Sequence, residues 1–256
     1  MPPGETLTGT VALVTGASSG IGAATAAAFA RHGAAVALAA RRQDRLDAVA
    51  GGIRDQGGTA LALEADVTSQ QQAVDAIART VNELGRLDTV INNAGVMLLG
   101  PALASSTEDW QQMLDLNVLG ALDVTHAALP HLVRAAQDSP RRVADIVNVS
   151  STAGRVARPG ASVYTLTKFG IAAFSEPLRQ ELIKQRVRVS VVEPGTVATE
   201  LVKHLREDVR KAAQSQVESI EPLRPDDIAD AVTYIVTRDR RVAVNEMLVR
   251  AAEQPW

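Results

Sequence analysis

The stretch TVALVTGASSGIG, residues 10–22, decides the fold. Its first six residues are apolar or β-branched and predict a buried strand, which runs into a glycine-rich turn and an alanine-rich segment. Gly16 permits a tight turn, Gly20 lets the backbone approach a phosphate, and Gly22 lets the next helix pack closely. The pattern predicts a strand–turn–helix unit whose helix N-terminus faces a pyrophosphate, with a turn that binds no ligand as the alternative.

The same alternation continues along the chain. Further strands are predicted at residues 35–39, 59–64, 88–92, 144–149, 188–192 and 246–250. Helices are predicted at residues 21–32, 44–56, 70–84, 107–135, 163–185 and 226–236. Continuous apolar strands separated by helices are typical of a parallel sheet covered on both faces. We therefore expect an α/β fold, a doubly wound Rossmann-type parallel sheet of about seven strands with ligands at the carboxyl ends of the strands.

Length and composition narrow the organisation and the partners. The 256 residues contain no linker, which predicts one domain over 1–256, and the polar segment 200–222 predicts a flap over the site. A net charge of −3 without a basic stripe speaks against nucleic-acid binding. The absence of Cys excludes disulfides, thiolate metal sites and a Cys nucleophile, and no metal is expected. Without a signal peptide or an apolar run of ~20 residues, the protein is expected to be cytoplasmic and not to contact membranes.

The end of the second predicted strand indicates the cofactor. Enzymes that use NAD place an acid about 20 residues after the glycine turn, where it binds the ribose hydroxyls. This chain reads AARR at residues 39–42, so the acid is missing and two guanidinium groups follow. A guanidinium suits a 2′-phosphate because it forms paired, charge-assisted hydrogen bonds. The sequence predicts NADP(H) with Arg41 as the nearer contact, and two solvated loop arginines are the alternative.

Four polar residues are candidates for the chemistry. Tyr164 and Lys168 lie four residues apart in a predicted helix, so both side chains lie on one face. A phenol with its usual pKa of ~10 is a poor base at neutral pH, and a nearby ammonium favours the phenolate. Ser151 follows the strand at 144–149, where its hydroxyl can hydrogen-bond a substrate carbonyl. Asn117 is a polar residue within an apolar run, and a structural role fits it as well as a site role.

Together these residues resemble the short-chain dehydrogenase/reductase family. The resemblance rests on TGASSGIG at 15–22, NNAG at 92–95, Asn117, Ser151, YTLTK at 164–168 and PGTVAT at 194–199. It implies that Ser151 orients the carbonyl and that Tyr164 transfers the proton. It also implies that Lys168 lowers the phenol pKa and binds the nicotinamide ribose, while Asn117 holds a water in a proton relay.

The resemblance further implies the cofactor contacts. Asp66 matches a position that contacts the adenine, and Arg41 matches the position that marks NADP(H) preference. Residues 194–199 match a segment that lines the nicotinamide. The implied contacts are Gly16, Ser18, Ser19, Gly20, Ile21, Gly22, Arg41, Arg42, Asp66, Val67, Asn93, Ala94, Gly95, Tyr164, Lys168, Pro194, Gly195, Thr196, Val197 and Thr199.

The expected activity is that of an NADP(H)-dependent oxidoreductase that interconverts an aldehyde or ketone and an alcohol by hydride transfer. It would serve secondary metabolism or have broad carbonyl specificity. Segments 91–100, 174–176 and 242–250 resemble a narrower branch that contains 3-hydroxy acid (serine-type) dehydrogenases and a clavulanate-9-aldehyde reductase. A dehydrogenase of small 3-hydroxy acids and a non-catalytic NADP(H)-binding sensor stay open as alternatives. Family members are usually dimers or tetramers, so a homodimer or homotetramer built on the two longest helices is expected.

The segments around the site predict its substrate side. Leu98, Leu99, Val156 and Leu201 predict a moderately hydrophobic pocket, whereas Arg155 and Arg158 favour an acidic substrate unless they are simply solvated. A serine hydrolase is disfavoured because no G-x-S-x-G elbow surrounds a serine.

Overall fold

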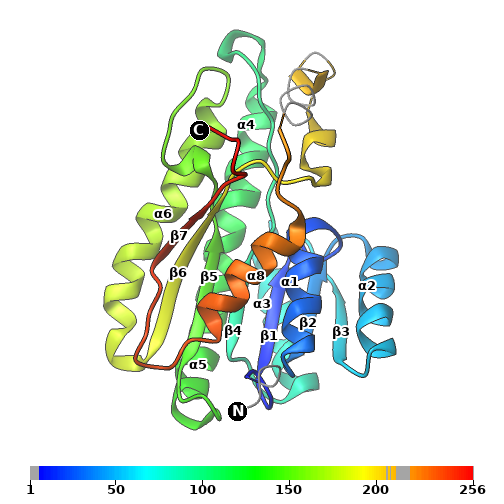
Figure 1. The fold of residues 1–256 in the computed structure, drawn as a ribbon, viewed down its shortest axis with the longest axis vertical. Coiled ribbons are helices and arrows are strands. Elements are labelled where there is room, and N and C mark those ends of the chain that lie inside the picture. Colours follow the sequence, from blue (N-terminus) through cyan, green and yellow to red (C-terminus); the bar gives the residue numbers. More distant parts are fainter. Residues whose placement is uncertain (1–5, 206, 208, 212–219, 256) are drawn as a thin grey trace.

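The computed structural model describes residues 6–205, 207, 209–211 and 220–255 of the chain. Within these residues, seven parallel strands form one sheet in the order β3-β2-β1-β4-β5-β6-β7 (Figure 1). The strands are β1 Val11–Thr15, β2 Ala35–Ala40, β3 Thr59–Glu64, β4 Thr89–Asn92, β5 Ala144–Val149, β6 Val187–Pro194 and β7 Glu246–Val249. The predicted doubly wound α/β fold is therefore confirmed.

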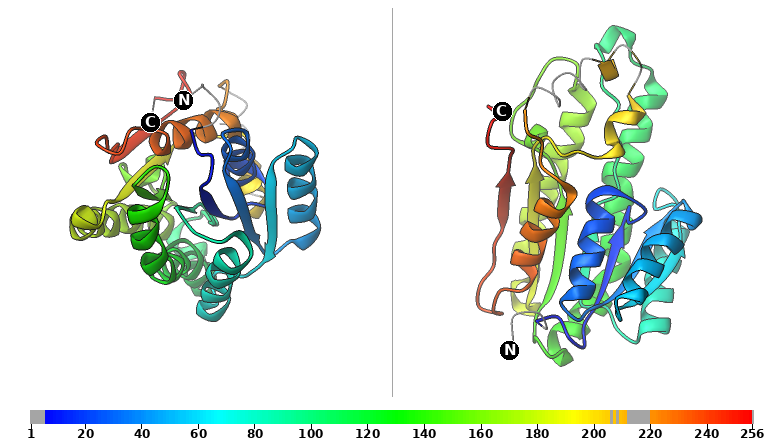
Figure 2. Two further views of the ribbon diagram at one scale, coloured as in Figure 1. Left: turned by 90° about the horizontal axis from the view of Figure 1, so that it is seen from below. Right: turned by 45° about the vertical axis from the view of Figure 1, so that its right-hand side comes forward.

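Helices cover both faces of this sheet (Figure 2). One face carries α1 Gly20–Arg31, α2 Gln43–Asp55 and α8 Pro225–Val236, and the other carries α3 Gln70–Leu84, α5 Gly120–Asp138 and α6 Ser162–Leu182. Val36 and Leu38 of β2 belong to the core under the first group, and Ala37 and Ala39 to the core under the second. Successive side chains of a strand point to opposite faces, so an uninterrupted apolar strand supplies both cores.

The prediction of one continuous helix over residues 107–135 is wrong. The segment 107–135 was expected to form a single helix, but the structure has α4 Thr107–Leu114, a π-helical turn at Asp115–Leu119 and then α5. The turn contains Asn117, whose side chain is bonded to the backbone of Val96. Single π turns inside α-helices often accompany functional sites, and periodicity alone does not reveal them.

Shorter elements complete the cavity end of the sheet. They are the 3-10 turns η1 Ala102–Ala104, η3 Thr152–Gly154 and η5 Glu200–His204. A further 3-10 turn, η4 Ile183–Gln185, joins α6 to the start of β6 at the opposite end of the sheet. The predicted flap at 200–222 begins with η5, and residues 206, 208 and 212–219 of it lie outside the described residues. In the part of the chain that the structure describes, no helix combines the length and apolarity needed to cross a membrane.

Candidate active site

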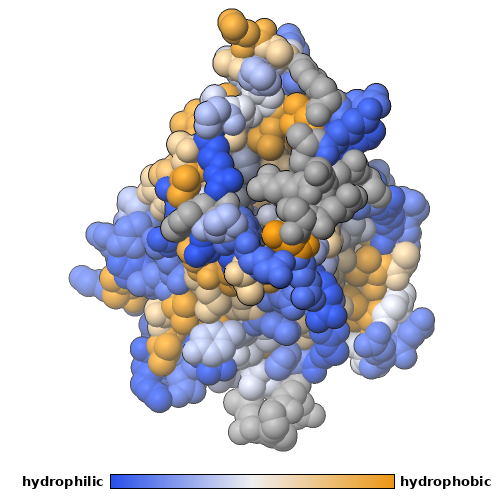
Figure 3. All heavy atoms as spheres, turned by 45° about the horizontal axis from the view of Figure 1, so that its top comes forward, coloured by the Kyte–Doolittle hydropathy of each residue, from blue (hydrophilic) through white to orange (hydrophobic). Residues whose placement is uncertain are grey.

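A cavity of about 700 Å³ lies at the carboxyl ends of the strands. This volume is within the usual range for small-molecule and cofactor sites, and the position is the one that doubly wound sheets favour for ligands. With this end turned partly toward the viewer, hydrophobic side chains lie among hydrophilic ones on the surface (Figure 3). The lining includes Gly16, Ser18, Ser19, Gly20, Ile21, Arg41, Arg42, Asp66, Val67, Asn93, Ala94, Gly95, Ser151, Tyr164, Lys168, Pro194, Gly195, Thr196, Val197 and Thr199. Among the predicted site residues, Gly22 and Asn117 do not line it.

The glycine-rich turn shows why its glycines are needed. Gly16 has a φ of +65°, a left-handed conformation that glycine adopts without strain. A Cβ at Gly22 would lie 2.5 Å from the carbonyl oxygen of Gly16 and 2.6 Å from Nδ2 of Asn93. Asn93 in turn donates from Nδ2 to the carbonyl of Thr15 at 2.9 Å. Gly22 and Asn93 therefore hold the turn against the end of β4, which leaves the N-terminus of α1 facing the cavity.

The turn after β2 brings positive charge to one end of the cavity. Arg42 donates from Nη2 to the hydroxyl oxygens of Ser18 at 3.0 Å and Ser19 at 2.9 Å. Glu200 joins this group, because its Oε2 lies 3.2 Å from Nη1 of Arg42 and 2.6 Å from Nη1 of Arg45. Arg41 also lines the cavity, but Arg42 makes the contacts with the glycine-rich turn. We call this arrangement of Ser18, Ser19, Arg41, Arg42 and Glu200 the arginine end.

The turn after β3 contributes Asp66 and Val67 to the cavity lining. The Oδ1 atom of Asp66 accepts hydrogen bonds from the backbone N–H of Thr68 at 3.0 Å and from its hydroxyl at 2.8 Å. This local turn fixes Asp66 and Val67 in the lining, because side-chain bonds to the backbone two residues on stabilise such turns.

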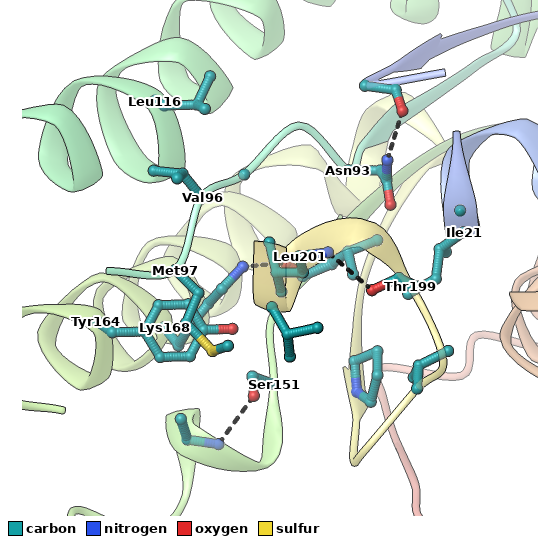
Figure 4. A pocket seen from close by; sticks show the side chains of 18 of the residues that line it. Ile21, Asn93, Val96, Met97, Leu116, Ser151, Tyr164, Lys168, Thr199 and Leu201 are labelled. Carbon is teal, nitrogen blue, oxygen red and sulfur yellow. Dashed lines mark hydrogen bonds between the residues drawn. The ribbon is translucent and has the colours of Figure 1, made fainter. Parts of the chain in front are cut away.

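At the opposite end, Ser151, Tyr164 and Lys168 converge from the end of β5 and from α6 (Figure 4). Tyr164 and Lys168 are each 7% exposed. Lys168 donates from Nζ to the carbonyl of Val149 at 2.9 Å, and the same Nζ lies 5.7 Å from the centre of the Tyr164 ring. Ser151 is oriented by the backbone N–H of Ala153, which donates to its Oγ at 3.1 Å. We call these three residues the catalytic end.

Burial dominates the ionisation of the catalytic end. Burial raises the pKa of the Tyr164 phenol, and the hydrogen bond with Ser151 opposes that rise. Burial lowers the pKa of Lys168 to about 8. The sequence-based expectation was a phenol pKa lowered by Lys168. In the structure the ammonium lies beside the ring and binds the Val149 carbonyl, so desolvation has the larger effect on the phenol.

Asn117 lies behind the cavity wall and is 3% exposed. Its Oδ1 accepts the backbone N–H of Val96 at 2.8 Å, and its Nδ2 donates to the carbonyl of Val96 at 2.9 Å and to Thr167 Oγ1 at 3.2 Å. The side chain thus ties the π turn to the segment after β4 and to α6.

The substrate side differs in part from the sequence prediction. Leu99, Val156 and Leu201 line the cavity as predicted, whereas Leu98 packs against the cluster of Val96, Met113 and Tyr164. The prediction that Arg155 contacts the substrate is wrong, because its Nη2 pairs with Oε2 of Glu193 at 2.6 Å and with Oε2 of Glu246 at 2.5 Å. Arg158 does line the cavity. Among the residues whose side chains the structure describes, no histidine lines the cavity.

Glu200 and Gln254 are among the lining residues that the sequence analysis did not single out. Glu200 begins the polar segment that was predicted as a flap, and only tertiary structure places it beside Arg42 and Arg45. Gln254 lies two residues from the C-terminus and carries no recognisable motif.

Known proteins resemble this chain over most of its length. An uncharacterized oxidoreductase of Staphylococcus saprophyticus is 33% identical over 247 residues, with 95% of this chain and 96% of that protein covered. Glycine betaine reductase of Emericella nidulans is 34% identical over 99% of this chain, which spans only 19% of that protein.

Solved structures also resemble this chain over most of its length. The closed form of serine dehydrogenase complexed with NADP+ has a TM-score of 0.88 at 30% identity, covering 96% of this chain and 97% of that one. The 3-ketoacyl-(acyl-carrier-protein) reductase from Brucella melitensis complexed with NADH has a TM-score of 0.83 at 28% identity, covering 96% and 98%.

The family model described as short chain dehydrogenase matches residues 10–210, which include the glycine-rich turn, Ser151, Tyr164 and Lys168. The chain therefore belongs to the short-chain dehydrogenase/reductase family of oxidoreductases.

Proposed function

We propose that the protein is an NADP(H)-dependent oxidoreductase that interconverts an aldehyde or ketone and an alcohol by hydride transfer. The observation that carries this proposal is a single cavity with two unlike ends. The arginine end fits a phosphate, and the catalytic end fits a carbonyl group. A dinucleotide links these two chemistries, since it carries phosphates at one end and the nicotinamide at the other.

The residues present fit such a cofactor. Arg42 and the hydroxyls of Ser18 and Ser19 form one polar cradle, with Arg41 beside it, and they suit a 2′-phosphate. Asp66, Val67 and residues 93–95 would hold the adenosine portion, and residues 194–199 the nicotinamide portion. The similar serine dehydrogenase is described with NADP+ and the similar reductase with NADH, so the preference for NADP(H) rests on the arginines of this chain.

The catalytic end is arranged for proton transfer. When bound, the nicotinamide supplies or accepts the hydride. In the reductive direction Tyr164 donates its proton to the carbonyl oxygen, and a phenol whose pKa burial raises still holds that proton at neutral pH. Ser151 donates a hydrogen bond to the same oxygen and stabilises its developing charge. Lys168 contributes positive charge beside Tyr164, and Asn117 positions the Val96 segment. The relay water assigned to Asn117 stays a prediction, because its side chain is bonded to Val96 and Thr167.

We propose a substrate with an apolar body, because Met97, Leu99, Val156 and Leu201 line the cavity. A small 3-hydroxy acid is the second candidate. It is favoured by Arg158 in the lining and by the similarity to serine dehydrogenase. An acid would gain from the guanidinium, whereas an uncharged carbonyl compound would not.

We also propose a homo-oligomer, as the sequence predicted. The two predicted long helices carry exposed apolar side chains. On the π turn Leu119 is 50% exposed, and on α6 Leu166 is 57% and Phe169 42% exposed. Exposed apolar side chains of this size favour contact with a second copy. Native mass spectrometry gives the subunit number, and a purely monomeric protein at micromolar concentration contradicts this part of the proposal.

The decisive experiment is a substrate panel with both cofactors. Oxidation of NADPH and of NADH is followed with apolar aldehydes and ketones, and the reverse reaction with serine and other 3-hydroxy acids. Turnover of apolar carbonyls with NADPH preferred over NADH supports the proposal. Turnover of the hydroxy acids alone selects the second candidate. Binding of NADPH without any turnover across the panel identifies a sensor instead.

A further inference from the structure

The segment after β7 returns to the cavity and places one side chain in its wall. Gln254 is 9% exposed and lines the cavity. The backbone N–H of Gln254 donates to the carbonyl of Ala251, and Arg250 donates from Nη1 to the carbonyl of Pro255 at 2.8 Å. These two bonds fold the C-terminal segment into a turn, and this turn carries the Gln254 side chain.

Gln254 holds the loop at residues 194–199. Its Oε1 accepts the backbone N–H of Thr196 at 2.8 Å. The bonds on either side of it are backbone to backbone, from the Gly195 N–H to the Val249 carbonyl, from the Leu223 N–H to the Thr196 carbonyl and from the Ala198 N–H to the Leu223 carbonyl. The Thr196 N–H is therefore held by a side chain, and this contact can be removed without altering the backbone.

Gly195 is fitted to the same side chain. A Cβ at Gly195 would collide with Oε1 of Gln254 and would lie 3.1 Å from the Cα of Arg250. Only glycine allows the loop and the C-terminal segment to approach this closely. The backbone of Gly195 therefore packs directly against the Gln254 side chain.

We infer that Gln254 is a positioning residue for the nicotinamide half of the cofactor site. It fixes the Thr196 N–H and through it the loop that faces the catalytic end. The inference rests on the proposed function, because it assumes that residues 194–199 hold the nicotinamide. None of the described hydrogen bonds of Gln254 reaches Ser18, Arg41 or Arg42 at the arginine end. Its removal should therefore affect one half of the cofactor and spare the other.

The test compares two ligands on the full-length protein by isothermal titration calorimetry. NADP+ carries both halves of the cofactor, whereas adenosine 2′,5′-bisphosphate carries the adenine and the 2′-phosphate without the nicotinamide. For Gln254→Ala we expect the Kd of NADP+ to rise about 10-fold, because a backbone N–H loses its acceptor. The Kd of the bisphosphate should stay within about 2-fold of wild type. Gln254→Glu keeps an acceptor oxygen and should restore most of the NADP+ affinity.

Two controls make the outcome decisive. Gln71→Ala changes an exposed glutamine of α3 that bonds only Asp75 among the described residues, and should leave both Kd values unchanged. Thermal unfolding of each variant checks that the fold is intact. Equal Kd values for NADP+ in wild type and Gln254→Ala, or equal losses for both ligands, overturn the inference while leaving the proposed function standing. A wild-type protein that binds neither ligand overturns both.

Discussion

The two ends of the cavity differ in their exposure to water and in the kind of electrostatics they use. At the arginine end, the side chain of Arg42 is 43% exposed and contacts Glu200, which also contacts the neighbouring Arg45, 44% exposed. At the catalytic end, Tyr164 and Lys168 are 7% exposed, and no carboxylate of the described residues contacts the Lys168 ammonium. One end is therefore a solvated cluster of mixed charge, and the other is a nearly dry site with one unpaired cation.

Under the proposed function, this difference separates cofactor binding at one end of the cavity from chemistry at the other. Exposed charges are screened by water and ions, so they select a ligand anion at little cost to the stability of the fold. Buried groups feel a lower dielectric, so their pKa values change and the fold bears the cost of desolvation. Changes at the arginine end should alter affinity and cofactor preference, and changes at the catalytic end should alter rate and stability.

The largest expected effect is on catalysis. Tyr164→Phe removes the hydroxyl that we propose exchanges a proton with the substrate oxygen, and it keeps the buried ring. We expect kcat to fall by about 10²- to 10⁴-fold, while the Kd of NADPH changes little. Steady-state kinetics and fluorescence titration measure the two quantities. A variant with the wild-type rate would show that Tyr164 is not the proton donor.

The second effect concerns the buried ammonium. Burial lowers the pKa of Lys168 from its ordinary 10.5 to about 8, so the folded state holds this proton less tightly than the unfolded state. Lys168→Met should therefore raise the stability of the cofactor-free protein at pH 7, by up to about 3 kcal/mol, although it lowers activity. The gain should shrink as the pH rises from about 8 toward 10.5, because wild-type Lys168 then loses its proton in the fold. Chemical denaturation at several pH values measures it, and a variant less stable than wild type at pH 7 contradicts the account.

The third effect isolates the 2′-phosphate. Arg42→Ala should weaken NADPH binding by about 10- to 100-fold and leave NADH binding nearly unchanged, because only NADPH carries the extra phosphate. Arg41→Ala is the matched comparison, since Arg41 lines the same end without contacting Ser18 or Ser19 in the described structure. A larger loss for Arg41→Ala would favour the sequence-based ranking of the two arginines. Equal losses for NADPH and NADH would remove the arginine end as the basis of cofactor preference.

The smallest effect tests the carboxylate within the arginine end. Glu200 binds the guanidinium groups that a phosphate would use, so the two anions compete. Glu200→Gln should tighten NADPH binding by about 2- to 5-fold, with less change for NADH, and the gain should fade at high salt. Weaker NADPH binding in this variant would mean that Glu200 assists the phosphate site instead of occupying it.

The sequence predicted the elements and most of the lining well, because both depend on local patterns. Apolar strands and amphipathic helices carry their own periodicity, and parallel strands end at a common edge. The errors were tertiary in origin. The π turn at Asp115–Leu119 contains Asn117, which bonds the backbone of Val96, 21 residues earlier in the chain. Arg155 pairs with Glu193 and Glu246, which lie far from it in the sequence, on β6 and β7.

The sequence by itself determined the fold class, the glycine-rich turn, the Tyr164–Lys168 spacing and the arginines after β2, since each is written in neighbouring residues. Only the tertiary structure decided that Arg42 meets the turn, that Glu200 faces it, and that Gln254 holds the loop at 194–199. It also decided the ionisation of the catalytic end, because desolvation depends on everything packed around a group. Spacing along the chain fixes which groups can meet, and packing fixes which of them do.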